Sequence, residues 1–218
     1  MKNIKTLRYF IFGLLFLGCQ EDFLQENPTS IIDPAALLTD KAGAEIYTVG
    51  AYDAARNALM SNFQTGWLNI WGVMAVDEIV SPGWSKFKPI YLHTVSPSDI
   101  IIRDIWENMY VNLNKVNSVI DRVGDMSEDQ IDDDNKNKLV AQARFLRAII
   151  NFALVSSWEN IPLIKNETTS LENLEVPQST PLDVYKFIEE DLLFVKDNLE
   201  AKQGGGRVTR GAAQAVLG

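Results

Sequence analysis

The chain has 218 residues, of which 46% are hydrophobic and 22% are charged. This is enough for one globular domain with a core, or for part of a larger one, and it excludes disorder and collagen-like repetition. The formal net charge of -9 argues against nucleic acid as a partner, because neutralising phosphates takes clustered Lys and Arg. One cysteine and one histidine exclude a disulfide framework and a Cys- or His-rich zinc site, so we expect neither metal nor cofactor.

Residues 1–18 have the layout of a secretory signal peptide. Three basic residues are followed by the apolar run YFIFGLLFL over residues 9–17. This run is too short to span a bilayer, which takes roughly 20 apolar residues in a helix. The single cysteine, Cys19, follows Gly18 where a signal peptidase would cut. The sequence therefore predicts a secreted protein whose mature chain begins at this cysteine.

The letters FLGC at residues 16–19 resemble the bacterial lipobox, in which the cysteine is diacylated and becomes residue one. Phe16 departs from the usual Leu, and an incidental cysteine after an ordinary signal is the alternative. We expect acyl chains on Cys19 to anchor the protein in membrane lipid. The mature chain would then hold 17 basic and 29 acidic residues, a net charge of -12, since residues 1–18 carry three bases and no acid. Residues 19–34 are polar, contain two prolines and read as a lipidated tether.

The tether is followed by helical patterning. Apolar residues recur at intervals of three and four over residues 44–59, with Thr39 or Asp40 as the N-cap. A second helix is expected over about residues 98–123, with Gly124 at its C-cap. The predicted buried stripe of this second helix consists of Ile102, Trp106, Met109, Tyr110, Leu113, Val116, Asn117, Ile120 and Val123.

Three more helices are expected further along the chain. The third, over about residues 136–158, is apolar nearly all round its second half, which is typical of the middle of a bundle. The fourth begins at the letters TPLD, with Thr180 as the N-cap and proline at the first helical position. The fifth opens at Thr209 and stops at Gly218, and because so short a helix is marginal alone, we expect the chain to be the N-terminal portion of a longer protein. The predicted buried seam of the fourth helix consists of Val184, Ile188, Leu192, Val195 and Leu199.

Two groups of charges invite functional interpretations. The acidic stretch over residues 125–134 lacks the spacing and central glycine of a calcium loop, so we expect a solvated connection whose acids cap the third helix. Arg144 and Arg147 lie on the most buried helix. Their charges need partners if enclosed, which predicts buried ion pairs that fix helix packing.

Several segments, taken in order along the chain, form a recognisable set: CQEDFLQENPTS, GAYDAARNAL, VDEIV, IWENMYVNLNKVNSVI, AQARFLRAIINFALVSSWENIPLI, VYKFIEEDL and GRVTRGAAQAVLG. Together they resemble the SusD/RagB family of outer-membrane nutrient-binding lipoproteins. The resemblance covers the mature chain and matches the N-terminal half of family members. It implies an all-α, tetratricopeptide-like helical-repeat solenoid of SusD type with irregular loop insertions, spanning residues 35–218 and truncated at its C-terminus.

The resemblance also implies a function. Family members sit at the cell surface as lids on a SusC-like TonB-dependent transporter, to which they deliver oligosaccharides or polysaccharides. The acidic residues after Cys19 resemble the surface-export signal of these lipoproteins. A helical-repeat scaffold that binds protein is the alternative, and it would need a concave groove of exposed apolar residues.

Residues 60–97 form the one long stretch without a clean helical period, and three tryptophans fall in it. Trp84 follows turn residues that would hold it at a surface, where an indole face suits the C–H face of a pyranose. Trp84 could equally cover the solenoid or contact the transporter, whereas Trp67 and Trp71 are spaced as the core of a short helix. The predicted ligand contacts are Trp84, Phe87 and Tyr91.

An enzymatic interpretation has little support in the sequence. Glycoside hydrolysis needs two carboxylates flanking the bond, and adjacent residues such as Asp77 and Glu78 rarely converge on one bond. We expect a turn or capping role for this pair and no catalytic residue. The single histidine, His93, is expected to face solvent or to be hydrogen-bonded structurally.

Overall fold

The computed structural model describes residues 33–60, 66–74, 76, 87–170, 172 and 174–218. The fold described here is that of one compact unit, residues 34–218. The predicted signal peptide, Cys19 and most of the predicted tether lie outside the described residues. Pro34, expected at the end of the tether, is the first residue of a short helix, α2 (Pro34–Leu37).

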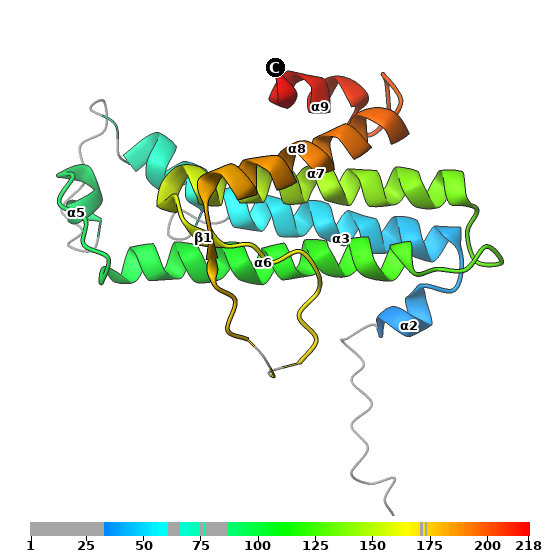
Figure 1. The fold of residues 1–218 in the computed structure, drawn as a ribbon, viewed down its shortest axis with the longest axis horizontal. Helices are drawn as coiled ribbons and strands as arrows, with labels where there is room; N and C mark the ends of the chain where they lie inside the picture. Colours follow the sequence, from blue (N-terminus) through cyan, green and yellow to red (C-terminus); the bar gives the residue numbers. More distant parts are fainter. Residues whose placement is uncertain (1–32, 61–65, 75, 77–86, 171, 173) are drawn as a thin grey trace, which may run out of the picture. The chain divides into compact units, whose positions relative to one another are not determined.

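The unit is all-α, as predicted, and its long helices follow one another along the chain (Figure 1). The long helices are α3 (Lys41–Met60), α6 (Ile100–Gly124), α7 (Asp133–Trp158) and α8 (Pro181–Asn198), and the shorter α9 (Arg210–Leu217) follows them. Between α3 and α6 lie the short helices α4 (Trp67–Asn69) and α5 (Lys88–Tyr91) and the π-helix η2 (Ile70–Met74). The described part of the stretch without a clean helical period thus contains these short helical segments.

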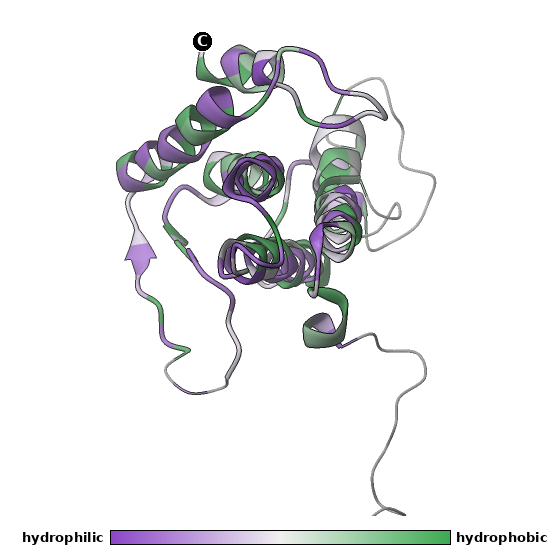
Figure 2. Ribbon diagram, turned by 90° about the vertical axis from the view of Figure 1, so that its right-hand side faces the viewer, coloured by the Kyte–Doolittle hydropathy of each residue, from purple (hydrophilic) through white to green (hydrophobic). Residues whose placement is uncertain are grey.

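Helix α7 occupies the middle of the bundle. It packs against α3, α6 and α8, while α9 packs on α8; Figure 2 looks along the long helices and shows α7 between its neighbours. Of the described helices, α7 alone is long and apolar enough to cross a membrane, yet 72% of its most apolar window is buried inside the protein. Its apolar surface is therefore used by neighbouring helices, which confirms the prediction of a central helix.

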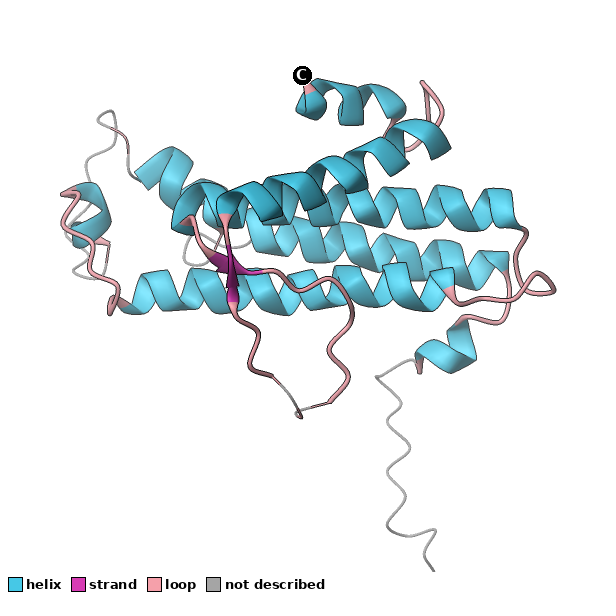
Figure 3. Cartoon of the chain, in the orientation of Figure 1, coloured by secondary structure: helices cyan, strands magenta, loops and turns pink. Residues whose placement is uncertain are grey.

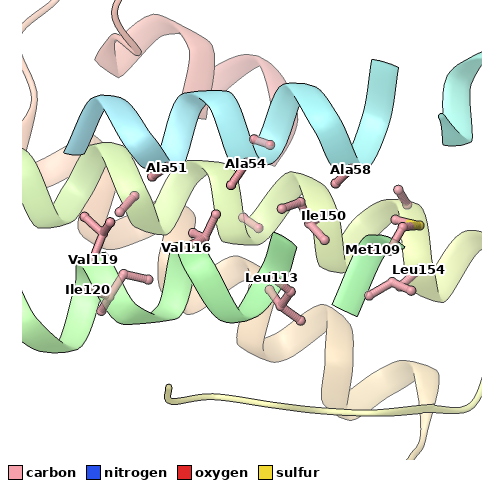
Figure 4. Packing of buried hydrophobic residues seen from close by; sticks show 14 of the residues in the cluster. Ala51, Ala54, Ala58, Met109, Leu113, Val116, Val119, Ile120, Ile150 and Leu154 are labelled. Atoms are coloured by element: carbon pink, nitrogen blue, oxygen red, sulfur yellow. The ribbon is translucent and has the colours of Figure 1, made fainter. Parts of the chain in front are cut away.

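Small side chains bring α3 close to its partners. Ala51, Ala54 and Ala58 are almost completely buried, and Figure 4 shows all three on one face of α3, turned toward side chains such as Val116 and Ile150 of α6 and α7. Because the distance between packed helices depends on the side chains at the contact, an alanine face permits a close approach. The three alanines belong to the apolar pattern that the sequence showed over residues 44–59.

Polar side chains begin the helices where the sequence predicted them. Asp40 accepts a hydrogen bond from the Gly43 backbone N–H at 2.9 Å, and Thr180 caps α8 by accepting from the Asp183 N–H at 3.3 Å. Asp132 and Thr209 cap α7 and α9 in the same way. Each side chain satisfies a backbone donor that the first helical turn leaves unpaired.

The predicted end of α6 is off by one residue. Gly124 belongs to the helix, and the C-cap is Asp125, with a φ of -82° in the right-handed region. The Asp125 N–H donates to the Asp121 carbonyl at 2.9 Å, so the chain leaves the helix without the left-handed turn for which a glycine is favoured.

Two short strands were not predicted. The strands β1 (Ile161–Pro162) and β2 (Gln178–Ser179) pair antiparallel, with Ile161 opposite Ser179 (Figure 3). The loop between them is held along α6, where Asn117 Nδ2 donates to the carbonyls of Ile164 and Asn166 at 3.1 Å each. The irregular insertion expected from the family resemblance is thus fixed to the bundle by hydrogen bonds.

A buried ion pair joins α7 to α8. Arg147 donates from Nε and Nη2 to the two carboxylate oxygens of Asp191, both at 2.8 Å. Its Nη1 donates to the Lys165 carbonyl at 2.6 Å and to Asn117 Oδ1 at 3.3 Å. Only 4% of Arg147 and 1% of Asp191 is exposed, so this buried charge is both paired and hydrogen-bonded, as a stable buried charge must be.

Arg144 completes this cluster from three residues earlier on α7, about one helical turn away. Its Nη1 lies 3.8 Å from Asp191 Oδ1, and its guanidinium lies 4.1 Å from the centre of the Phe194 ring. Burial lowers the pKa of Arg144, and the Asp191 carboxylate partly opposes that shift. The prediction of a buried ion pair that fixes helix packing is confirmed for Arg147. Arg144 is 31% exposed and only approaches the same carboxylate.

Candidate functional site

An aromatic pocket opens where α6 begins and α7 ends. We call it the tryptophan pocket, and its volume is about 480 Å³, within the range of small-ligand sites. Three of its walls are indole rings, and its polar groups are few, which is the usual make-up of a ligand pocket. The pocket is lined by Trp71, Val95, Ser96, Pro97, Ile102, Arg103, Trp106, Ser157 and Trp158.

The tryptophans reach the pocket from three different helices. Trp106 lies in the second turn of α6, Trp158 is the last residue of α7, and Trp71 belongs to η2. The centroid of the Trp106 ring is 5.3 Å from that of the Trp158 ring, in an edge-to-face arrangement, and 4.8 Å from that of the Tyr110 ring. Tyr110 is itself fixed, because its hydroxyl donates to the Pro162 carbonyl at 2.8 Å, and burial raises its pKa. The rings are therefore held in place before any ligand arrives.

The two neighbouring indoles of the α4–η2 segment differ in their hydrogen bonding. Trp67 Nε1 donates to Ser157 Oγ at 2.6 Å, and that hydroxyl donates to the Ala153 carbonyl at 2.9 Å. Trp71 Nε1 is buried without a hydrogen-bond acceptor within the part of the chain that the structure describes. Both rings pack against the hydrophobic core, as their spacing predicted, but Trp71 also forms a wall of the pocket.

The rim of the pocket carries an arginine. Arg103 is 62% exposed, and its nearest carboxylate oxygens, on Asp104 and Glu107, are both 3.6 Å from its nitrogens. That separation is longer than a hydrogen bond. Ring faces with a few donors at the rim suit a ligand that has both C–H faces and hydroxyls. Over the described residues, no group of three or more His, Cys, Asp or Glu forms a metal site.

The structure separates the predicted contacts. Trp84, together with Asp77 and Glu78, lies outside the described residues. Phe87 is only 1% exposed, so its prediction as a ligand contact is wrong for this structure: the hydrophobic core covers the ring, which leaves no face on which a sugar could stack. Tyr91 is half-buried on α5 and stays a prediction.

Other sequence expectations fare differently. His93 is exposed, as expected, and has a φ of 52°. Trp106, predicted as part of a buried seam, is only half-buried because one side of it lines the pocket. Trp158 was not singled out, since an aromatic residue at the end of an apolar helix carries no signal of its own. Only the three-dimensional meeting of separate helices identifies the pocket.

The fold and the pocket together define a helical-repeat protein with an aromatic pocket where α6 begins and α7 ends. Residues 19–218 match the SusD-like family described as starch-binding and associating with the outer membrane, and the chain belongs to this family.

Relatives and solved structures agree with this assignment. A SusD-like protein of Bacteroides ovatus is 26% identical over 205 residues, which cover 94% of this chain and 36% of the relative. A laminarin-binding SusD-like protein superposes with a TM-score of 0.68 at 25% identity, over 82% of this chain and 39% of its own. A structure with a xylogluco-oligosaccharide has a TM-score of 0.68 at 26% identity, over 80% and 33%. The chain thus spans little more than a third of these proteins.

Proposed function

We propose that this protein is a lipid-anchored protein of the outer-membrane surface that binds glycans or other nutrients and delivers them to a SusC-like TonB-dependent transporter. The observation that carries the proposal is the tryptophan pocket in a chain of the SusD-like family. Two similar structures support a glycan as the ligand, one described as laminarin-binding and one containing a xylogluco-oligosaccharide. The proposed activity is binding, with no catalytic step.

The chemistry of the pocket supports a sugar. A pyranose presents polarised C–H groups on one face, and an indole presents the negative face of its quadrupole, so the two stack. Trp106 and Trp158 offer rings that are already oriented by each other. Trp84 and Tyr91 are proposed as further ligand contacts from the segment between α3 and α6.

Calorimetric titration of the full-length protein with laminari- and xyloglucan oligosaccharides tests the binding function. Trp84→Ala should weaken the affinity by about 1 to 3 kcal/mol, by analogy with stacking on nucleic-acid bases, with little loss of stability. The matched control is Val49→Ala, which truncates an exposed side chain of α3. Absence of binding to every member of a broad glycan array would contradict the proposed function. Normal binding by a Trp84→Ala protein that melts early would instead place Trp84 in the core.

A separate experiment tests the anchor. Cys19→Ala should release the protein from the membrane fraction, because no acyl chain could be attached to it. The acidic residues at positions 21 and 22, next to the anchor, are proposed to direct export, so their replacement should protect the protein from protease added to intact cells. Unchanged membrane retention of the Cys19→Ala protein would rule out lipidation as the anchor.

A further inference from the structure

We propose that Arg103 determines the specificity of the tryptophan pocket and that the pocket takes an uncharged sugar unit, whose hydroxyls the guanidinium binds. The inference rests on the proposed glycan-binding function and adds to it the class of sugar and the residue that selects it. It is carried by the position of Arg103, by its long ion pairs and by the charges beside it.

The position of Arg103 brings its guanidinium to a ligand stacked on the tryptophans. Arg103 and Trp106 are three residues apart on α6 and therefore neighbours on one face of the helix, and both line the pocket. A guanidinium presents several N–H donors in a rigid planar fork. Vicinal hydroxyls of a sugar are acceptors that such a fork can hold while the ring stacks on an indole.

Arg103 keeps N–H donors for a ligand because the nearest carboxylates, on Asp104 and Glu107, are too far away to accept hydrogen bonds from it. Arg56, Arg122 and Arg147 each hold a carboxylate oxygen at 2.7 to 2.9 Å. The carboxylates of Asp104 and Glu107 stop at 3.6 Å from Arg103, beyond the usual hydrogen-bond length. The two acids thus attract the guanidinium without accepting its hydrogen bonds, so its N–H groups stay available to a ligand.

The charges around Arg103 select against an anionic ligand. Among the described residues that line the pocket, Arg103 is the one that carries a charge. Asp104 and Glu107 together exceed that charge by one unit. Neither acid lines the pocket, but both lie 3.6 Å from Arg103 and offset its charge at the rim. A uronate or sulfated sugar therefore gains little from this cation, and the like charges beside it oppose binding. An uncharged sugar meets no such repulsion, so Arg103 acts on it as a hydrogen-bond donor.

The test uses the full-length protein, a laminari-oligosaccharide as the uncharged probe and an oligogalacturonate as the anionic probe. Arg103→Ala should lower the affinity for the laminari-oligosaccharide on the order of tenfold, which corresponds to about 1.4 kcal/mol. Arg103→Lys should retain part of the affinity, because an ammonium group still donates hydrogen bonds but lacks the planar fork. Arg56→Ala is the matched control, since Arg56 has the same 62% exposure and lies outside the pocket; its affinity should equal that of the wild type.

Salt dependence separates hydrogen bonding from charge. The tenfold loss should be the same at low and at high salt, because screening weakens exposed charge pairs much more than hydrogen bonds to a neutral ligand. Wild-type affinity in Arg103→Ala would overturn the role of this residue. Tighter binding of oligogalacturonate than of laminari-oligosaccharide would overturn the uncharged class. A wild-type protein that binds no glycan would overturn the proposed function itself, a result distinct from the other two.

Discussion

Arg147 and Arg103 carry the same guanidinium group in two regions of the protein that use it in opposite ways. Between α7 and α8, Arg147 is almost completely buried and holds Asp191 with two hydrogen bonds of 2.8 Å. At the rim of the tryptophan pocket, Arg103 is mostly exposed, and its carboxylates lie 3.6 Å away. A guanidinium whose hydrogen bonds are all made within the protein fixes packing, whereas one with donors to spare is available to a ligand.

The hydrophobic side chains of the two regions also differ, because those in the middle of the bundle are closely packed and those at the pocket leave open space. In the middle of the bundle, alanines such as Ala54 of α3 are fully buried, and the helices pack closely (Figure 4). At the ends of α6 and α7, large indoles enclose about 480 Å³ of open space, and the Trp71 N–H has no acceptor in the described part of the chain. Close packing is interrupted at the pocket, where a binding site is expected to interrupt it. Hydrogen bonding does not separate the two regions, because Arg144 Nε and Asn151 Oδ1 on α7 are also buried without a partner among the described residues.

The largest expected effect is at the buried ion pair. Asp191→Ala would leave the Arg147 charge enclosed without its carboxylate, and such removal costs about 3 to 5 kcal/mol of unfolding free energy. Urea denaturation of the full-length protein measures the loss. Asp197→Ala on the same helix is the control, because that carboxylate is 70% exposed and 4.0 Å from Lys196. A loss no greater than that of the control would remove the distinction between the two guanidinium sites.

Trp106 tests the other side of the comparison. Trp106→Ala should cost about 2 to 3 kcal/mol of stability, less than the roughly 3 to 5 for a fully enclosed tryptophan, because one side of the ring faces the pocket. It should also weaken glycan affinity by about 1 to 3 kcal/mol, by analogy with aromatic stacking on bases.

Leu154→Ala on α7 provides the contrast to Trp106→Ala. Leu154 is fully buried, so its truncation should cost about 2 to 5 kcal/mol of stability and leave glycan affinity unchanged. Denaturation and calorimetric titration of both variants provide the measurements. Equal affinity of the two variants would show that the indole of Trp106 belongs to the core alone.

Overpacking the alanine face tests the close approach of α3. Ala58→Leu inserts three carbon atoms at a site with no exposed surface and should cost about 1 to 3 kcal/mol. Ala42→Leu makes the same change at an exposed position of α3 and should leave the free energy of unfolding nearly unchanged. Thermal and urea denaturation of both variants compare the two sites. Equal stability would indicate that α3 has room to move away from α6 and α7.

The sequence could predict features that depend on neighbouring residues, but not those that arise when distant helices meet. Caps such as Thr180 and the stripes of the long helices depend on residues a few positions apart, so their pattern is visible along the chain. The need of Arg147 for a buried partner was also predictable, but its partner was not, because Asp191 reaches it only when α8 packs on α7. The tryptophan pocket likewise joins three helices distant in sequence, and the two-residue strands β1 and β2 are too short to show alternation.

The smallest expected effect concerns the start of the helix that carries Asp191. Thr180 Oγ1 accepts from the Asp183 backbone N–H at 3.3 Å and donates to the Asp183 carboxylate at 2.6 Å. Thr180→Ala removes both bonds and should cost about 1 kcal/mol of unfolding free energy, while Thr180→Ser keeps the hydroxyl and should cost little. Denaturation of the two variants measures the difference, and glycan affinity should be unaffected in both. A Thr180→Ala protein as stable as Thr180→Ser would show that α8 is positioned by Asp191 and its apolar seam without help from its cap.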